Sequence, residues 1–249
     1  MFLPIFDPGW RNANLHENDL AIQETGLTGG ARNLDQMHTL LDHCDPVRLG
    51  RGAFVWKGAI APHAATIIQR IAQIAVTSPF RHMASPNGHM SVAMTSCGKI
   101  GWTSSRQGYA YEAIDPLTKQ QWPAMDARLA TLARYYARLG GFDDFRPSTC
   151  LINRYKAGTR LGLHVDADEN DCTQPIVAFS LGLPALFRWG GLARSAPAQT
   201  IKLEHGDVIV WGGEDRLRYH GIAKVIDAPP TPRLDVRYAL TFRYVARCA

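Results

Sequence analysis

Cysteine is scarce in this sequence of 249 residues, and no two cysteines form a Cys-x-x-Cys pair. Their odd number and wide scatter argue against a disulfide framework and against a thiolate zinc site. The five positions are Cys44, Cys97, Cys150, Cys172 and Cys248. A reducing compartment, and therefore a cytoplasmic location, is the simplest prediction.

Long apolar runs are also missing, since no stretch reaches the roughly 18 residues that a membrane-spanning helix needs. The first residues, MFLPIFDPGWRNANLHEND, carry no basic segment ahead of an apolar core. We therefore expect neither secretion nor a membrane partner. No internal repeat or low-complexity tract is visible in the sequence either.

The sequence contains more basic than acidic residues, and it has enough apolar residues for a full hydrophobic core. The formal net charge is +5, the pI is near 9.0, and 46% of the residues are hydrophobic. This length fits one large domain, and the positive charge favours a polyanionic partner because basic groups near phosphates release counterions. We expect a monomer with an N-terminal extension over residues 1–50 and one domain over residues 51–249.

Helical periodicity is confined to the first part of the chain. Apolar residues recur at helical spacing over Pro62–Thr77 and over Pro123–Leu139, and Gly140 with Gly141 would end the second helix. A short third candidate, Leu34–His43, lies in the polar extension, to which we assign no chemistry. Both long apolar stripes predict core contacts.

After Gly141 the pattern changes to short alternating runs separated by glycine or proline. These runs are CLINRY, PIVAFSLG, ALFRW, DVIVWGG and DVRYALTFR. Many short strands after two helices predict an α+β fold, a double-stranded β-helix (jelly roll) with its core at about 142–245 and helices packed on one face.

A candidate metal site combines His164, Asp166 and His220. In an extended segment His164 and Asp166 project from the same face, so both could bind one ion. His220 follows the strand DVIVW, where a jelly roll could return a third ligand. Two histidines and one carboxylate form the facial triad of non-haem Fe(II) oxygenases, although the same set also suits zinc hydrolysis.

A second signal comes from the last strand, where Arg237 and Arg243 alternate onto one face. Their Cα atoms would lie about 20 Å apart, so two inward-leaning side chains could hold a short dicarboxylate between them. Asn153 and Tyr155, also two residues apart, offer an amide and a phenol for the same pocket. A zinc hydrolase gives no reason for this arginine pair.

Taken together, these residues resemble the AlkB family of dioxygenases over about Arg51–Arg243. The segments that carry the resemblance are FRHMASPNGHMSVAMTSCGKIGWTSSRQGYAY, CLINRYKAGTRLGLHVDADE, SLGLPALFRWGG, LEHGDVIVWGGEDRLRYHG and RYALTFR. The resemblance implies a jelly roll with an N-terminal nucleotide-recognition lid at about 80–115. It also implies Fe(II) and O2 as cofactor and co-substrate, together with 2-oxoglutarate.

The resemblance assigns a role to each site residue. His164, Asp166 and His220 would hold Fe(II). Arg237 would pair with the distal carboxylate of 2-oxoglutarate, supported by Asn153, Tyr155 and Arg243. The base pocket would be formed by Met94, Trp102, Tyr109 and Asp168, and Arg194 would contact a phosphate near the lesion. Two positions depart from the family pattern, namely Ala239 in place of an asparagine and His89 in place of a tyrosine.

The implied activity is oxidative dealkylation of N-alkylated bases such as 1-methyladenine and 3-methylcytosine. Single-stranded DNA is the expected substrate, and RNA is the second, with release of formaldehyde, succinate and carbon dioxide. The alternatives are a 2-oxoglutarate-dependent hydroxylase of tRNA, protein or a small molecule, and a catalytically silent nucleic-acid-binding module. The silent module has no need of a complete metal triad.

Overall fold

The computed structural model describes residues 45–86, 88–169, 171–228 and 234–246. Contacts divide the chain into Met1–Leu41 and Asp42–Ala249, and the described residues all belong to the second unit. The predicted helix Leu34–His43 lies outside the described residues. The division between an extension and a domain at residue 50 stays a prediction.

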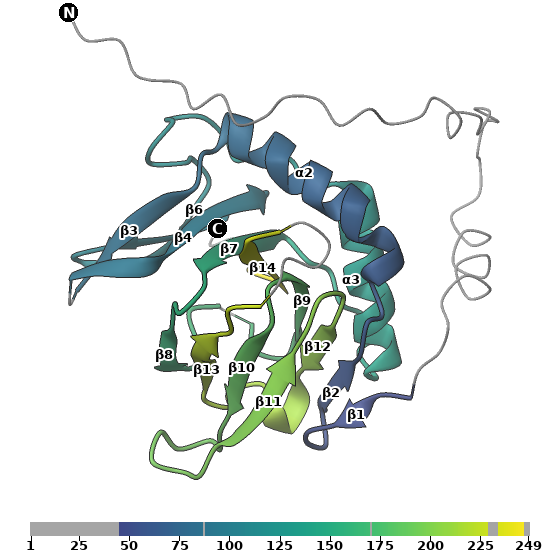
Figure 1. The fold of residues 1–249 in the computed structure, drawn as a ribbon. Helices are drawn as coiled ribbons and strands as arrows, with labels where there is room; N and C mark the ends of the chain where they lie inside the picture. The colour runs from purple at the N-terminus through teal and green to yellow at the C-terminus, as the bar shows by residue number, and fades with distance from the viewer. Residues whose placement is uncertain (1–44, 87, 170, 229–233, 247–249) are drawn as a thin grey trace, which may run out of the picture. The chain divides into compact units, whose positions relative to one another are not determined.

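Two antiparallel sheets form the body of the molecule (Figure 1). The larger sheet contains, in spatial order, β1 (Val47–Arg48), β2 (Ala53–Trp56), β12 (Val208–Trp211), β9 (Ile176–Gly182), β14 (Val236–Arg243), β7 (Thr149–Lys156), β4 (Gly88–Gly98) and β3 (Arg81–Ser85). The smaller contains β11 (Gln199–Leu203), β10 (Ala185–Trp189), β13 (His220–Val225) and β8 (Leu161–His164). The predicted α+β jelly roll is confirmed, and all five alternating runs form strands.

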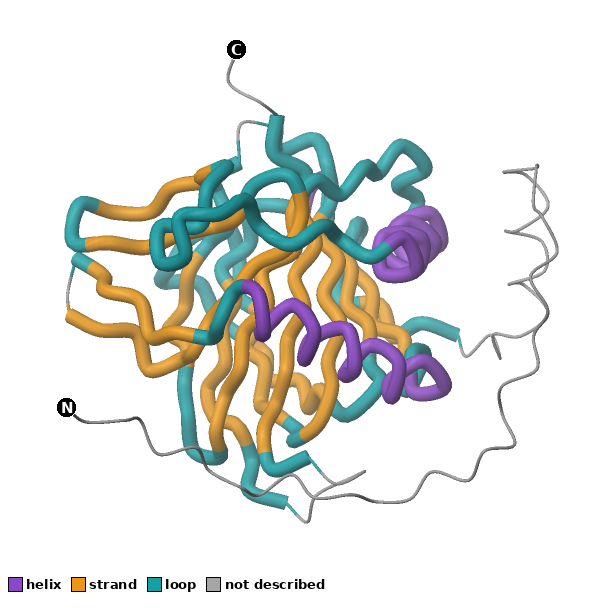
Figure 2. The backbone as a smooth tube through the Cα atoms, turned by 90° about the horizontal axis from the view of Figure 1, so that it is seen from above, coloured by secondary structure: helices purple, strands orange, loops and turns teal. Residues whose placement is uncertain are grey.

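Two helices, α2 (Ala64–Thr77) and α3 (Ala127–Leu139), cover the outer face of the larger sheet (Figure 2). Short 3-10 turns, Ala61–His63 and Gly213–Asp215, precede α2 and follow β12. The stripe of α2 buries Ile67, Ile71 and Ile74, as its periodicity predicts. Within the described part of the chain, no helix is long and apolar enough to span a membrane.

The predicted start of the second helix at Pro123 was wrong by four residues. Asp126 has an extended backbone, and its side chain accepts a hydrogen bond from the backbone N–H of Arg128, so it is the N-cap. The helix therefore begins at Ala127 and excludes Met125, which the apolar stripe had included. The predicted end at Gly140 is confirmed.

The region expected to form a lid, about 80–115, contains β3, β4 and a separate hairpin of β5 (Gly101–Ser105) and β6 (Gly108–Glu112). Strand β4 pairs with β7 and so joins this region to the larger sheet. At its base Arg81 donates two hydrogen bonds to the buried carboxylate of Asp115, at 3.0 and 2.6 Å. The two ends of the lid region are thus fixed to each other.

Strand β14 separates the core from the functional cavity. Leu240 and Phe242 are buried on the face toward the helices, where Phe242 contacts the ring of Phe179. The opposite face carries Arg237, Ala239, Thr241 and Arg243, and all four line one cavity between the sheets. The period-two pattern of this strand therefore determines which side chains reach the site.

Candidate active site

A cavity of about 630 Å³ lies between the two sheets and the lid. Its walls come from β7 and β14 of the larger sheet, from β8 and β13 of the smaller sheet, and from the lid. Every site residue predicted from the sequence lines it: Met94, Trp102, Tyr109, Asn153, Tyr155, His164, Asp166, Asp168, Arg194, His220, Arg237 and Arg243. The structure therefore brings all twelve together, across more than half of the chain.

His164, Asp166 and His220 lie close enough to bind one ion. Their ligand atoms all lie within 4.8 Å of one another. The Nε2 atoms of His164 and His220 are 3.7 and 3.6 Å from the carboxylate oxygens of Asp166. The two histidines are direct partners in the β8–β13 ladder, so strand register sets their separation.

Hydrogen bonds orient both imidazoles. The Nδ1 atom of His164 lies 2.9 Å from the carbonyl of Gly162, and that of His220 lies 3.0 Å from the carbonyl of Arg218. Because a carbonyl only accepts, each Nδ1 carries the proton and each Nε2 keeps its lone pair for a metal. Partial burial and the neighbouring His220 lower the pKa of His164 to about 4, so this ligand is neutral at neutral pH.

Asp166 is buried beside a cation. Arg243 Nη2 donates to its Oδ2 at 2.7 Å. Burial raises the pKa of Asp166, but Arg243 and the hydrogen bond with His220 lower it by more, so the pKa lies well below the usual value. The carboxylate is therefore ionised, as a metal ligand must be.

Gly221 permits the close approach of β13 to β8. A Cβ atom at this position would lie 2.7 Å from the backbone oxygens of both Leu161 and Gly162. The ladder is irregular at this point, between His220 and Ile222. A side chain at Gly221 would push apart the two strands that carry the histidines.

The other end of the cavity holds a guanidinium that lacks a counter-ion. Arg237 is 1% exposed and donates to Ser180 Oγ at 2.8 Å and to the carbonyl of Leu183 at 3.3 Å. Its Nε and the Oδ1 of Asn153 have no hydrogen-bond partner, and no carboxylate of the described chain pairs with Arg237. Burial lowers the pKa of Arg237 to about 10, so the group remains a cation at neutral pH.

Arg237 and Arg243 therefore have different surroundings, although the alternation of the strand predicted the same role for both. Arg243 already holds Asp166, whereas Arg237 faces the cavity without an anion. Buried charges in proteins are paired or bind ligands. Arg237 is thus the better site for an incoming carboxylate, with Asn153 and Tyr155 opposite Ala239 and Arg237 on the neighbouring strand β7.

Comparison with known proteins decides the class. Residues 52–243 match the model of the 2OG-Fe(II) oxygenase superfamily. The chain is 48% identical over 200 residues to the alpha-ketoglutarate-dependent dioxygenase AlkB of Escherichia coli, covering 80% of this chain and 93% of that one. This protein belongs to the AlkB family of that superfamily. It is an Fe(II)- and 2-oxoglutarate-dependent dioxygenase, and the predicted cofactors are confirmed.

The chain is also similar to more distant AlkB relatives. An AlkB homolog of Caulobacter vibrioides is 37% identical, over 73% of this chain and 81% of its own. The human nucleic acid dioxygenase ALKBH1 is 29% identical over 53% of this chain and 33% of its own length. The solved structure of OsALKBH1 superimposes with a TM-score of 0.69 at 24% identity, over 80% of this chain and all of that one. This last likeness supports the fold.

The residues present fit the AlkB cofactors. The donor set of two imidazoles and one carboxylate is the one that non-haem iron prefers. The unpaired cation of Arg237 and the unsatisfied Oδ1 of Asn153 mark a polar pocket that lacks a partner. A dicarboxylate co-substrate would supply the missing negative charge.

Aromatic residues of the lid form the outer wall of the cavity. Trp102 and Tyr109 are stacked on strands β5 and β6, with ring centroids 5.2 Å apart and planes tilted by 27°. Trp102 is buried, whereas 51% of Tyr109 is exposed. The indole Nε1 of Trp102 donates to Asp168 Oδ2 at 3.3 Å, and Asp168 itself is exposed.

The remaining predicted residues take different positions along this wall. Met94 is 2% exposed, and it both packs within the core and lines the cavity. Arg194 is exposed, and its Nη1 donates to the carbonyl of Leu163 at 2.8 Å. Of the two departures, Ala239 lies on the cavity wall and His89 lies exposed on β4.

Several residues beside the site were not predicted from the sequence. Ser180 binds Arg237, Trp211 contacts the ring of His220 at 5.0 Å, and Glu169, Arg216 and Tyr111 surround Asp166 and Arg243. Ser180 alternates with Ala178 on β9, so the period of that strand could have indicated it. Glu169 and Arg216 lie outside strands, and no periodicity marks them.

Proposed function

We propose that this enzyme removes alkyl groups from N-alkylated bases, with 1-methyladenine and 3-methylcytosine in single-stranded DNA as first substrates and RNA as second. The observation that carries the proposal is the position of Trp102 and Tyr109 on the cavity that contains the metal ligands. Stacked aromatic side chains are suited to an unstacked base. The relatives named AlkB and nucleic acid dioxygenase support the same substrate class.

The residues that line the cavity can be assigned to the metal and to the co-substrate. His164, Asp166 and His220 would hold Fe(II), and Arg237 with Asn153 and Tyr155 would bind 2-oxoglutarate. Bound Fe(II) would supply oxidation of the N-alkyl carbon by O2, coupled to decarboxylation of 2-oxoglutarate into succinate and carbon dioxide. A hydroxylated N-methyl group on such a cationic base then breaks down into formaldehyde, a proton and the unmodified base.

The protein's own residues would orient the base and exclude water. Trp102 and Tyr109 would stack on the ring, and Asp168 would lie near the positive charge that methylation places on adenine or cytosine. A base must leave its duplex stack to reach this cavity, and that step costs least in a single strand. This cost is the reason for proposing single-stranded substrates.

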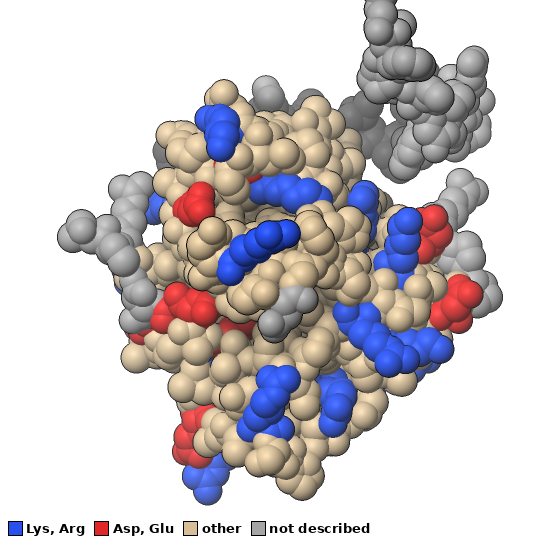
Figure 3. Space-filling model, turned by 90° about the vertical axis from the view of Figure 1, so that its left-hand side faces the viewer, with Lys and Arg blue, Asp and Glu red and all other residues tan. Residues whose placement is uncertain are grey.

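Surface charge supports a nucleic-acid partner. On the face that carries the lid, Lys and Arg side chains are spread over the middle, while most Asp and Glu side chains lie toward the sides (Figure 3). Arg194 combines exposure with a place on the cavity wall, so it would contact a phosphate near the lesion. We also infer a monomer acting in the cytoplasm, in keeping with the free thiols of Cys97, Cys150 and Cys172.

The test is incubation with Fe(II), ascorbate, 2-oxoglutarate and oligonucleotides that carry 1-methyladenine or 3-methylcytosine. Single-stranded DNA, duplex DNA and RNA form parallel arms, and a tRNA and a peptide library form the comparison arms. We expect loss of the methyl group by mass spectrometry, with formaldehyde and succinate in equal amounts. Hydroxylation of only the comparison substrates would contradict the proposal, and His220→Ala is the inactive control.

A further inference from the structure

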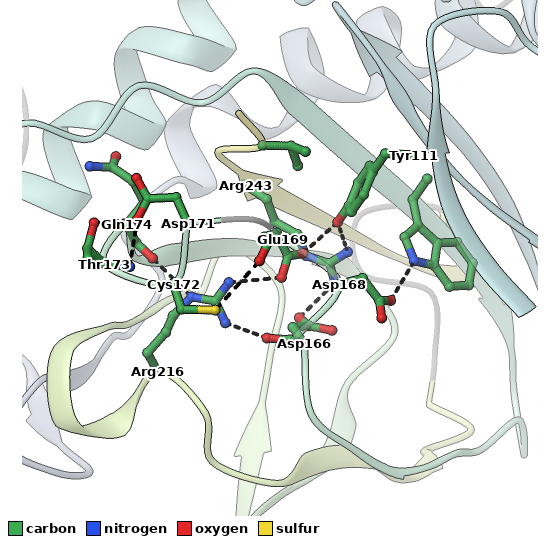
Figure 4. Close-up of polar contacts among 12 residues, drawn as sticks. Tyr111, Asp166, Asp168, Glu169, Asp171, Cys172, Thr173, Gln174, Arg216 and Arg243 are labelled. Atoms are coloured by element: carbon green, nitrogen blue, oxygen red, sulfur yellow. Dashed lines mark hydrogen bonds and ion pairs between the residues drawn. The ribbon is translucent and has the colours of Figure 1, made fainter. Parts of the chain in front are cut away.

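Four charged side chains form a buried cluster that includes the metal ligand Asp166 (Figure 4). They are Asp166, Glu169, Arg216 and Arg243, and each side chain is at most 8% exposed. Two carboxylates face two guanidinium groups, so the cluster is neutral as a whole. This balance matters because a buried charge without a partner is costly.

The two arginines bind Asp166 at different ends. Arg216 Nη1 donates to the backbone carbonyl of Asp166 at 2.5 Å. Arg243 Nη2 donates to the carboxylate of Asp166 at 2.7 Å. Together they fix both the backbone and the side chain of the only acidic residue in the metal triad.

Glu169 is the carboxylate that these two arginines share. Arg216 Nη2 donates to its Oε2 at 3.0 Å, and Arg243 Nε lies 3.4 Å from its Oε1. The Glu169 side chain is 1% exposed. These contacts therefore fix the position of the Glu169 carboxylate, and Glu169 in turn helps to fix the two guanidinium groups.

Tyr111 connects the same carboxylate to the lid. Its hydroxyl donates to Glu169 Oε1 at 2.5 Å and accepts from Arg243 Nη1 at 3.1 Å. Tyr111 lies on β6 directly opposite Trp102 on β5, and Trp102 donates to Asp168. The β5–β6 hairpin is thus attached twice to the segment that contains Asp166, once through Asp168 and once through Glu169.

We propose that Glu169 is a positioning residue that joins the β5–β6 hairpin to the metal ligand Asp166, so that movement of the lid is transmitted to the metal site. The part concerning the lid rests on the proposed function, because a base is what would move the hairpin. The part concerning the metal does not. Glu169 acts in both through Tyr111, Arg216 and Arg243.

The metal part follows from charge. Without the negative charge of Glu169, two guanidinium groups would face one carboxylate that must also bind a divalent cation. Residues that orient metal ligands typically contribute roughly 10- to 100-fold to metal affinity. Glu169→Gln keeps the size of the side chain and removes its charge.

The first experiment measures Mn(II) affinity by electron paramagnetic resonance, without nucleic acid. We expect Glu169→Gln to bind Mn(II) roughly 10- to 100-fold more weakly than the wild type. Asp115→Asn is the matched control, since it removes the negative charge of a buried carboxylate whose ion pair, with Arg81, does not touch Asp166. Wild-type Mn(II) affinity in folded Glu169→Gln would overturn the proposal.

The second experiment uses the Co(II) protein and a single-stranded oligonucleotide with one 1-methyladenine. We expect binding to shift the visible spectrum of the wild-type metal site. Tyr111→Phe should still bind the oligonucleotide but lose at least half of that shift, whereas Tyr136→Phe, whose hydroxyl bonds to Ala59 away from the site, should keep it. A full shift in Tyr111→Phe, or none in the wild type, would overturn the transmission.

The two experiments also separate this proposal from the proposed function. If the wild type fails to demethylate any oligonucleotide, the proposed function fails, yet the Mn(II) affinity of Glu169→Gln still decides the role of Glu169. If demethylation occurs and Mn(II) affinity is unchanged in that variant, only the positioning role fails. Anisotropy of a labelled oligonucleotide verifies that Tyr111→Phe still binds.

Discussion

Asp166 and His164 are two residues apart, but their surroundings differ. Asp166 is buried against Arg243, whereas 37% of the His164 side chain is exposed. Removing one partner of a buried ion pair leaves the other charge unpaired. The same substitution to alanine therefore has different consequences at the two positions.

We predict that both alanine variants abolish turnover but that only Asp166→Ala strongly destabilises the metal-free protein. The expected loss in free energy of unfolding is about 3 kcal/mol for Asp166→Ala, because Arg243 loses its closest carboxylate. For His164→Ala it is about 1 kcal/mol or less. Urea unfolding in EDTA measures both, and equal losses would contradict the assignment of Arg243 to Asp166.

Arg237 has the opposite character, since it is buried and no carboxylate in the described part of the chain pairs with it. We predict that Arg237→Gln raises the KM for 2-oxoglutarate roughly 10- to 100-fold, the equivalent of a lost hydrogen-bonded charge pair. Steady-state succinate formation measures this. Arg154→Gln, on the same sheet but stacked over Phe80, serves as the control, and an unchanged KM in Arg237→Gln would assign the carboxylate to another group.

Asp168 offers a test of lesion selectivity. Methylation at N1 of adenine or N3 of cytosine leaves a cation, and Asp168 lies at the cavity beside Trp102. Because Asp168 is exposed in the free protein, we expect a modest effect, roughly fivefold in kcat/KM. Asp168→Asn should show this loss on 1-methyladenine and 3-methylcytosine but not on neutral 1-methylguanine or 3-methylthymine. Equal losses on both groups would indicate a structural role.

At the scale of elements, an ion pair between Arg81 and Asp115 closes the base of the lid region. Asp115 is fully buried and accepts from Ser78, from the backbone N–H of Leu117 and from Arg81. Burial raises the pKa of Asp115, but these hydrogen bonds and the Arg81 charge lower it by more, to below its usual value of 3.8. A depressed pKa stabilises the fold above the unfolded value and loses that effect as pH falls.

We therefore predict that Asp115→Asn lowers the free energy of unfolding at neutral pH, on the order of 3 kcal/mol, and that the difference from wild type shrinks between about pH 5 and pH 3. Urea titrations across this range measure it. A difference that stays constant with pH would show that Asp115 acts through its shape and not through its charge.

Elements also show what the sequence could and could not predict. Alternation placed Arg237 and Arg243 on one face of β14, and the structure agrees. Alternation does not predict which residues of other segments a side chain will contact, so the ion pair between Arg243 and Asp166 was not predicted from the sequence. The predicted start of α3 was wrong because Asp126 caps the N-terminus of the helix, so Met125 lies before the helix although it fits the apolar spacing.

At the scale of the whole molecule, the layer arrangement followed from the order of periodicities, but the strand order did not. The larger sheet places β2 from the start of the domain beside β12 from near its end. Such pairings depend on contacts between distant segments, which no local pattern encodes. Glu169, Arg216 and Tyr111 meet for the same reason, although they lie up to 105 residues apart.

We predict that ligands stabilise the whole domain in two steps. Mn(II) at about 100 times its dissociation constant should add about 2.7 kcal/mol to the free energy of unfolding, and 2-oxoglutarate should add a further increment. Unfolding with EDTA, with Mn(II), and with both ligands measures the steps. Arg237→Gln should keep the Mn(II) step and lose most of the second, and loss of both would place Arg237 at the metal.

Because His164 and His220 are partners in a β-ladder, metal binding depends on the register of the two strands. These residues are 56 positions apart in the sequence, and they meet only when β8 and β13 align correctly. A slip by one residue would turn one imidazole to the opposite face. Because the two histidines meet only after these strands pair, we expect the ion to bind the folded domain and to act mainly by slowing unfolding. On this view the metal stabilises the folded domain and does not direct its folding.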